Sequence, residues 1–403
     1  MLKMKKRILF VDDDPLLLQI YTRRLAPEGE TWEVATADSG AGALELMGHS
    51  CFDVVVSDMR MPGMDGLELA QQVRSRYPCT ARIILSGIAD QEEVARCLGT
   101  THQFMAKPVD FKALKATLSR IGALEAHLRD QKLRTLVSQL AGVPSFPFLY
   151  LEIMKALSAE DSSIETIAGI VAKDPSMTAK VLQTVNSAVF GLGQKVSNPF
   201  EAVQFIGTSV LRSVVLSSQV FSFFEGKAAV HLPVERLWTH SIRTAQLASR
   251  LLKLEKAEPT DADDAYVAGM LHDLGKLMLA HNLPGQYQQA VRLASARKLS
   301  LHQAELEVFG ATHAGAAAYL LGLWGLPAPI VEAVAFHHVP GNSDLRTFGP
   351  LAAVHVANVL EHEQTATLPG ECASELSMDY LRAVGVQDRL RAWREELSSP
   401  QCA

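Results

Sequence analysis

The stretch Ile8-Leu-Phe-Val-Asp-Asp-Asp14 introduces the pattern of the first part of the chain. Apolar residues suited to a buried strand run directly into acids, and similar short runs recur between helical patterns such as Leu16–Leu25 and Leu67–Arg76. The predicted strands are Ile8–Val11, Trp32–Ala35, Val54–Ser57, Ile83–Ser86 and Gln103–Ala106. This alternation predicts an α/β fold, a doubly wound five-stranded parallel sheet with helices on both faces.

Polar side chains stand at the ends of these strands, where a parallel sheet binds its ligands. The residues concerned are Asp12 and Asp13 after the first strand, Asp58 after the third, Ser86 at the end of the fourth and Lys107 after the fifth. Three converging carboxylates stay ionised only if a cation offsets their repulsion, and oxygen ligands suit Mg²⁺. The lysine adds a second positive charge, which could hold a phosphoryl oxygen.

Residues 6–120 resemble the receiver domain of response regulators. The matching segments are Ile8–Asp14, Asp58-Met-Arg-Met-Pro-Gly-Met-Asp-Gly66, Leu85-Ser-Gly87 and Lys107-Pro108. The resemblance implies a flavodoxin-like fold in which Asp58 accepts a phosphoryl group. It also implies a Mg²⁺ site formed by Asp12, Asp13, Asp58 and the backbone carbonyl of Arg60, with Ser86, Phe104 and Lys107 as switch residues. The alternative is an inactive relative whose acids only cap strands.

Asp14 has a different expected role from its acidic neighbours. It directly precedes Pro15, and an aspartate before a proline is a favourable start for a helix. We therefore expect Asp14 to cap the helix that follows.

The segment from Asp110 to Leu140 has a helical pattern whose apolar phase slips before Leu133. A two-stranded coiled coil between two copies of the chain is one interpretation, and a helix packed on its own neighbours is the other. Gly142-Val-Pro-Ser-Phe-Pro147 then breaks the helix and marks a boundary.

From residue 148 onward, apolar residues recur at helical spacing, which predicts an all-α region. Examples are Leu149–Leu157, Ile164–Val171, Thr178–Val185, Val203–Ile206 and Val210–Leu216. The stretch Val308–Val331 carries no Asp, Glu, Lys or Arg. Because it contains His313, Pro327 and Pro329, we interpret it as a buried helix ended by proline, not as a membrane span.

Several of the 13 histidines stand where a metal site could form. They are His240, His272 in Met270-Leu-His-Asp-Leu-Gly-Lys276, His313, and the pair His337-His338. The adjacent His272-Asp273 is the most specific of these, because a carboxylate beside an imidazole can bind or bridge a cation. The alternative is a polar network that packs the helices without binding metal.

These residues resemble the HD phosphohydrolase superfamily, and residues 138–340 resemble more narrowly the HDOD domain, a relative regarded as a signalling module. The supporting segments are Val143-Pro-Ser-Phe-Pro147, Lys173-Asp-Pro-Ser-Met177, Val185-Asn-Ser-Ala188, Ala202-Val-Gln-Phe-Ile-Gly207 and Trp324-Gly-Leu-Pro327. The expected domains are therefore a receiver at 1–120, a helical linker at 121–142 and an all-α HDOD domain at 143–403, with its core at 143–340 and C-terminal helices at 341–403.

Departures from the hydrolytic pattern bear on catalysis. The resemblance implies metal ligands at His240, His272, Asp273 and a final acid, but the last position is Asn358, a neutral and weaker ligand. His313 and His337 could partly compensate at a second metal. The histidine pair is followed by Val339-Pro-Gly-Asn342 and not by the Gly-Tyr-Pro of the branch that cleaves cyclic di-GMP.

Composition limits which classes of protein this chain can belong to. The 403 residues are 48% hydrophobic and carry a net charge of −6, which suits two or three globular domains and offers no general field for nucleic acid. The cysteines show no paired spacing, which suits a reducing compartment: Cys51, Cys79, Cys97, Cys372 and Cys402. The N-terminal residues do not resemble a secretory signal, so we expect a cytoplasmic protein.

Two functions follow as expectations. The first is a bacterial two-component response regulator, phosphorylated on Asp58 by a sensor histidine kinase, whose non-catalytic HDOD domain engages a protein partner. The second is a phosphorylation-controlled metal phosphohydrolase that acts on a nucleotide or cyclic dinucleotide through a divalent transition metal. Neither requires nucleic-acid or membrane binding, and a homodimer through the linker helix is compatible with both.

Overall fold

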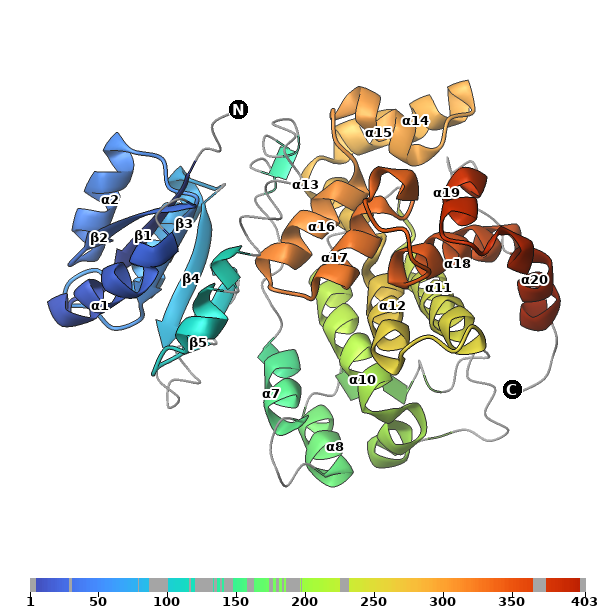
Figure 1. Ribbon diagram of the computed structural model, residues 1–403, viewed down its shortest axis with the longest axis horizontal. Helices are drawn as coiled ribbons and strands as arrows, with labels where there is room; N and C mark the ends of the chain where they lie inside the picture. The colour runs from blue at the N-terminus through green and yellow to red at the C-terminus, as the bar shows by residue number, and fades with distance from the viewer. Residues whose placement is uncertain are drawn as a thin grey trace. The chain divides into compact units, whose positions relative to one another are not determined.

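The computed structural model describes residues 5–28, 31–78, 80–86, 101–115, 117–119, 148–157, 163–173, 198–224, 232–364 and 375–398, with a few single residues between 133 and 196. The chain forms two compact units, one mainly before residue 139 and the other mainly from residue 147 onward (Figure 1). The expected linker helix at 121–142 and its glycine–proline boundary lie largely outside the described residues. Each unit is described by itself.

The first unit is built on a parallel sheet with strands in the order β2-β1-β3-β4-β5. The strands are β1 (Lys6–Val11), β2 (Trp32–Ala37), β3 (Val54–Asp58), β4 (Ala81–Ser86) and β5 (Gln103–Ala106). Asp58 at the end of β3 pairs in register with Leu85, and Ser86 at the end of β4 pairs with Ala106. The carboxyl ends of the central strands therefore meet at one edge, and the predicted parallel α/β architecture is confirmed.

The two faces of the sheet are covered by different helices: α1 (Pro15–Leu25), α2 (Gly40–His49) and α3 (Gly66–Arg76). Leu9 and Val11 join a buried cluster with residues of α2 and α3. Phe10 points to the opposite face, where its ring stacks on Tyr21 of α1 with centroids 4.8 Å apart. Alternate β1 residues thus bury against helices on both faces, as a doubly wound sheet requires.

Aspartates start two of these helices. The Leu16 amide donates to Asp14 Oδ1 at 2.8 Å, and the Glu68 amide donates to Asp65 Oδ1 at 2.8 Å. Each bond satisfies an amide that has no partner within its own helix. The predicted cap at Asp14 is confirmed. The Asp14 carboxylate accepts a hydrogen bond from the start of α1, so we do not count it with Asp12 and Asp13 as a candidate metal ligand.

The described elements of the second unit are helices. They are α7 (Phe148–Leu157), α8 (Ile164–Ala172), α10 (Pro199–Phe224), α11 (Val234–Leu254), α12 (Pro259–Leu271), α13 (Leu274–Asn282), α14 (Pro284–Arg297), α15 (Leu301–Val308), α16 (His313–Leu323), α17 (Ala328–Phe336), α18 (Pro350–Gln364), α19 (Met378–Ala383) and α20 (Leu390–Ser398), with short 3₁₀ turns at Pro340–Asn342 and Gln387–Arg389. The predicted all-α region is therefore confirmed for the described residues.

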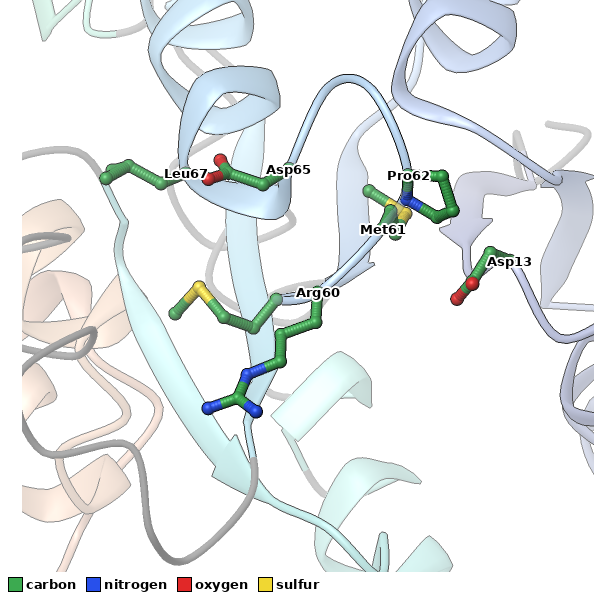
Figure 2. Close-up of a pocket in the computed structure, with 7 residues that line it drawn as sticks. Asp13, Arg60, Met61, Pro62, Asp65 and Leu67 are labelled. Carbon is green, nitrogen blue, oxygen red and sulfur yellow. The ribbon is translucent and has the colours of Figure 1, made fainter.

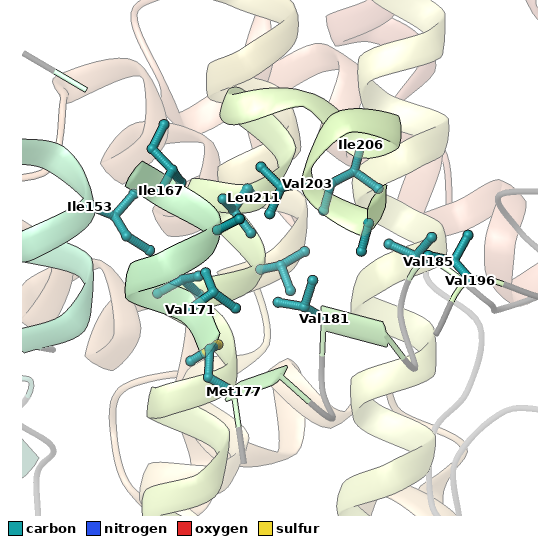
Figure 3. Close-up of a cluster of buried hydrophobic side chains, with 14 residues drawn as sticks. Ile153, Ile167, Val171, Met177, Val181, Val185, Val196, Val203, Ile206 and Leu211 are labelled. Atoms are coloured by element: carbon teal, nitrogen blue, oxygen red, sulfur yellow. The ribbon is translucent and has the colours of Figure 1, made fainter. Parts of the chain in front are cut away.

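Helices α7, α8 and α10 share a buried apolar cluster (Figure 3). Ile153, Ile167 and Leu211 represent the three helices in it, and each is at most 1% exposed. Gly207 interrupts α10 with φ +72°, a backbone conformation that suits glycine and separates the two apolar runs expected from the sequence.

The interpretation of Val308–Val331 as one helix ended by proline was wrong. Helix α15 ends at Val308, α16 ends at Leu323, and a turn with Gly325 at φ +80° follows. Pro327 instead occupies the N-cap of α17. Proline at the start of a helix loses no hydrogen bond, because the first amides have no partner there.

The C-terminal helices pack onto the second unit. Trp393 of α20 is fully buried, and its indole Nε1 donates to Glu255 Oε1 at 2.8 Å. Arg389 also donates to this carboxylate at 2.8 Å. Among the described residues, no helix is both long enough and apolar enough to cross a membrane.

Candidate functional site

An acidic cluster lies at the carboxyl edge of the sheet. Asp12, Asp13 and Asp58 each place a carboxylate oxygen within 4.8 Å of the others. Asp12 and Asp58 are buried and Asp13 is exposed, so the cluster opens to solvent on one side. The three predicted acids are therefore brought together, in a geometry that fits a hydrated, oxygen-liganded cation such as Mg²⁺.

Lys107 bridges two of these acids. Its Nζ lies 2.5 Å from Asp58 Oδ1 and 3.0 Å from Asp12 Oδ2. Burial lowers the pKa of Lys107, but its bonds to Asp58 and Asp12 outweigh burial and raise the pKa overall. The ammonium therefore remains charged and offsets part of the repulsion between the carboxylates.

A cavity of about 450 Å³ opens beside the acids, lined by Asp13 and the loop between β3 and α3 (Figure 2). The Arg60 side chain extends away from Asp13, while its amide donates to Asp58 Oδ2 at 3.2 Å. The backbone of Arg60 is thus held against Asp58, where its carbonyl was expected to serve as a ligand. Pro62 and Met61 form the wall facing Asp13.

Of the expected switch residues Ser86 and Phe104, the structure describes the side chain of Ser86. Ser86 is buried at the end of β4, beside the strand that carries Asp58. Phe104 lies on β5, but its side chain is outside the described part of the chain. Its expected switch role stays a prediction.

A second polar cluster lies inside the helical unit, centred on Asp273. His272 and Asp273 occupy the break between α12 and α13, and α11 contributes His240. His313 begins α16, and His337 and His338 follow α17 directly. The distances from Asp273 are 2.8 Å from Oδ2 to Lys276 Nζ, 3.3 Å from Oδ2 to His272 Nε2, 3.6 Å from Oδ2 to His240 Nε2, 3.2 Å from Oδ1 to His313 Nε2 and 3.8 Å from Oδ1 to His337 Nε2.

Two glycines allow these elements to approach. A Cβ at Gly275 would lie 1.9 Å from the carbonyl oxygen of His313, and a Cβ at Gly269 would lie 2.5 Å from the Cα of Ala245. Only a residue without a side chain fits at either contact. The glycine of His-Asp-Leu-Gly-Lys therefore allows the start of α16 to lie against α13, which places His313 beside Asp273.

Two of the histidines are anchored by buried carboxylates. His240 Nδ1 contacts Glu361 Oε2, and His313 Nδ1 lies 2.6 Å from Glu305 Oε2. Glu305 also accepts the His313 amide at 2.8 Å. A carboxylate on Nδ1 fixes the orientation of the ring and makes Nε2 a better ligand, as is common for metal-bound histidine.

Two more histidines are anchored by backbone carbonyls. His272 Nδ1 lies 2.8 Å from the oxygen of Gly269, and His337 Nδ1 lies 2.8 Å from the oxygen of Val334. Because a carbonyl only accepts, Nδ1 donates in each ring, and Nε2 of each ring faces Asp273.

The charges of the cluster are tightly balanced. Burial raises the pKa of Asp273, but His272 and Lys276 outweigh it and hold that pKa well below its usual range. Burial lowers the pKa of His313, but Glu305 and Asp273 raise it to about 9 overall. Burial and His272 lower the pKa of His337, which keeps that ring neutral.

Two atoms of the cluster are buried without a hydrogen-bond partner among the described residues. They are Asp273 Oδ1 and His337 Nε2, and both are acceptors when Asp273 is ionised and His337 is neutral. Asn358 Oδ1 is likewise buried and unpartnered. His313 Nε2 and His337 Nε2 lie 3.2 and 3.8 Å from Asp273 Oδ1, and this set of imidazole and carboxylate groups fits a transition-metal ion.

The sequence identified most of this cluster and missed its supports. His240, His272, Asp273, His313 and His337 come together as expected. The sequence places His338 beside His337 without indicating it as a ligand, although its Nε2 lies 3.1 Å from His313 Nε2. Glu305, Glu361 and Lys276 were also missed; of these, only Lys276 carried a local signal, the His-Asp-Leu-Gly-Lys run.

Comparison with known sequences assigns both parts of the chain. Residues 8–119 match the response regulator receiver domain, and residues 143–340 match the HDOD domain. An uncharacterised protein of Treponema pallidum is 24% identical over 310 residues, which cover 73% of this chain and 59% of that protein. The transcriptional regulatory protein GlrR of Escherichia coli is 29% identical over 220 residues, which cover 54% of this chain and 46% of GlrR. The chain thus spans about half the length of these relatives.

Among solved structures, an HDOD domain protein of unknown function from Geobacter sulfurreducens is similar with a TM-score of 0.56 and 23% identity. The similarity covers 68% of this chain and 93% of that one. It supports the fold of the helical unit and carries no assignment of activity.

Proposed function

The chain joins a response regulator receiver domain to an HDOD domain, and from this we propose that it is a two-component response regulator controlled by phosphorylation of Asp58. The observation that carries the proposal is the arrangement of three aspartates and Lys107 at the carboxyl edge of the sheet. Each of these residues has a distinct part in holding a phosphoryl group.

Asp58 is the proposed nucleophile. One of its oxygens attacks the phosphorus of a phosphohistidine on a sensor kinase, and the kinase histidine leaves. Lys107 already contacts Asp58 Oδ1 at 2.5 Å, so it can move onto a phosphoryl oxygen that projects from this carboxylate. Ser86, buried at the end of the adjacent strand, is the proposed hydroxyl that approaches the phosphoryl group.

Mg²⁺ is the proposed cofactor of this step. Asp12, Asp13, Asp58 and the carbonyl of Arg60 would hold the ion, which neutralises the charge that builds up on the transferred group. The exposure of Asp13 leaves one side of the cluster open to water and to the incoming phosphoryl group.

Labelling with acetyl phosphate tests this proposal without the cognate kinase. We expect the full chain to gain a phosphoryl group in the presence of Mg²⁺, measured by intact mass. Asp58→Asn and chelation of Mg²⁺ should each abolish the gain. A matched control is Asp14→Asn, because Asp14 caps α1 and is not part of the proposed Mg²⁺ site. Equal labelling of Asp58→Asn would refute the assignment.

The proposed output is a protein contact made by the HDOD domain, not catalysis. Asn358 supports this choice, because an amide where a hydrolase has a carboxylate removes one negative charge from the metal shell. The proposed partners are therefore a sensor histidine kinase and a protein that distinguishes the phosphorylated chain from the unphosphorylated one. A cytoplasmic location and a dimer formed through residues 121–142 are part of this proposal.

A metal-dependent phosphohydrolase is the second candidate. The histidines that surround Asp273 with Nε2 facing it favour this function. A bound metal would supply an activated water, and Asp273 with His240, His272, His313, His337 and Asn358 would hold the metal. Release of phosphate from a panel of nucleotides and cyclic dinucleotides, abolished by Asp273→Asn, would favour it over the protein-contact output.

A further inference from the structure

The peptide group between Asp58 and Met59 is held at both ends. Its amide, on Met59, donates to the carbonyl of Leu85 in β4 at 3.0 Å. Its carbonyl, on Asp58, accepts a hydrogen bond from Ser57 Oγ at 2.8 Å. A peptide that is bonded through both its amide and its carbonyl cannot rotate without losing a bond, so the backbone at the end of β3 has a fixed orientation.

The next peptide group, between Met59 and Arg60, is held in the same way. The Met59 carbonyl accepts from the Gly66 amide at 2.9 Å, and the Arg60 amide donates to Asp58 Oδ2 at 3.2 Å. The orientation of the first peptide therefore determines where the Asp58 carboxylate and the Arg60 carbonyl lie. Both are groups of the proposed phosphorylation site.

Ser57 places a hydroxyl in an apolar part of the sheet. It is 1% exposed, and its in-register neighbours are Val11 of β1 and Ile84 of β4. Both neighbours belong to buried apolar clusters that include side chains of α3. A buried hydroxyl without a partner is costly, and the Asp58 carbonyl is the partner here. A core position thus carries a polar group that is directed at the backbone of the proposed phosphoacceptor.

The start of α3 also confines the Asp58 carbonyl. Gly66 is the first residue of α3, and a Cβ at this position would lie 2.2 Å from the Asp58 oxygen. The absence of a side chain lets the helix lie directly against that oxygen. The carbonyl is therefore limited by the close approach of Gly66 as well as by its bond to Ser57.

We propose that Ser57 is a positioning residue for phosphoryl transfer. Its hydroxyl holds the Asp58 carbonyl, which fixes the direction of the Asp58 carboxylate and keeps the Arg60 carbonyl at the proposed Mg²⁺ site. A displaced or tilted carboxylate reacts more slowly, because attack on phosphorus needs a defined geometry. The inference rests on the proposed phosphorylation of Asp58 and adds to it a residue that acts through the backbone.

The rate of labelling by acetyl phosphate tests this role in the full chain. Ser57→Val and Ser57→Thr introduce side chains of the same shape, but only threonine keeps the hydroxyl. At saturating Mg²⁺ we expect Ser57→Val to be labelled at least about fivefold more slowly than wild type, and Ser57→Thr to stay within about twofold of wild type. Ser57→Val should also need more Mg²⁺ to reach half of its limiting rate, because the Arg60 carbonyl is less well placed.

Thr80→Val is the matched control. Thr80 is buried and its Oγ1 donates to the Phe52 carbonyl at 2.9 Å, but it directly precedes β4, at the end of that strand opposite to the acids. Loss of this bond should lower the free energy of unfolding in urea and leave the labelling rate within about twofold of wild type. Circular dichroism checks that each variant is folded, so that the rates compare folded chains.

Three results would count against the proposal. Equal labelling rates of Ser57→Val and Ser57→Thr would overturn it, since the hydroxyl would then be unimportant. A decrease in Thr80→Val as large as that in Ser57→Val would overturn it too, because the loss of any buried hydrogen bond would then slow labelling. Failure of wild type to become labelled is a distinguishable result, which would refute the proposed phosphorylation of Asp58 and with it the role of Ser57.

Discussion

Glu305 and Glu361 have the same task at opposite sides of Asp273. Each is buried, and each holds the Nδ1 of a histidine whose Nε2 faces that aspartate. A buried carboxylate that only packed helices would cost stability without such a partner. Their placement therefore argues that the rings are being oriented.

Substitution of Glu305 measures this orienting effect. Glu305→Gln keeps the size of the side chain but removes its charge, so His313 becomes a weaker ligand. We expect the affinity for Zn²⁺ to fall by about 10- to 100-fold. Competition with a chromogenic chelator measures the affinity, and Glu307→Gln, on an exposed side chain of the same helix, is the control. Equal affinities in both variants would contradict an orienting role for Glu305.

At the level of single residues, the sequence predicted the site residues that lie at strand ends. It did not predict the carboxylates that hold the histidine rings. Asp12, Asp58 and Lys107 could be predicted because strand ends in a parallel sheet meet at one edge. Glu361 could not, because it lies 121 positions from His240 and carries no local motif. Such a pair is set by helix packing, which a single sequence does not reveal.

Helix α13 depends on close contact with the start of α16. Gly275 lies against the His313 carbonyl, where a Cβ would be 1.9 Å from the oxygen. Gly275→Ala should therefore lower the free energy of unfolding by about 1–3 kcal/mol and displace His313, weakening Zn²⁺ binding. Gly169, at an exposed position of α8 with nothing within 4 Å of a Cβ, is the matched control. Gly169→Ala should stabilise the protein slightly and leave the metal unaffected. Identical effects of the two substitutions would show that the contact is unimportant.

Asp264 of helix α12 makes the free energy of unfolding depend on pH. Burial, followed by the nearby Asp261 and Asp263, raises the pKa of Asp264 to about 6, although Arg212 opposes the shift. Since the folded state prefers the protonated acid, stability contributed by Asp264 is lost as the pH rises from about 4 through about 6. Asp264→Asn should therefore be more stable than wild type at pH 7.5, and the difference should shrink at pH 5. Urea unfolding at both pH values measures this; a difference that does not depend on pH would contradict it.

At the scale of elements, periodicity predicted helices and strands well where caps and turns were clear. Asp14 and Pro15 marked the start of α1, and the structure agrees. The error lay between α16 and α17, where an uncharged run concealed a turn at Gly325. Low charge indicates burial but does not distinguish one buried helix from two.

At the scale of the whole molecule, a receiver domain with a proposed phosphorylation site precedes a helical HDOD domain. The sequence predicted both domains because each carries several spaced motifs. It could not predict how the signal passes between them, since adjacency along the chain is no evidence of coupling. Our proposal is that phosphorylation at Asp58 changes the region after the receiver and thereby the surface that the HDOD domain presents.

Hydrogen exchange measured by mass spectrometry tests whether a phosphoryl group on Asp58 alters the region after the receiver. The full chain is compared with and without beryllofluoride and Mg²⁺, which mimic the phosphoryl group on Asp58, and Asp58→Asn serves as the control. We predict altered exchange in the receiver and in peptides from residues 110–200 of wild type, and no change in Asp58→Asn. Changes confined to the receiver, with residues 110–200 unaltered in wild type, would contradict it.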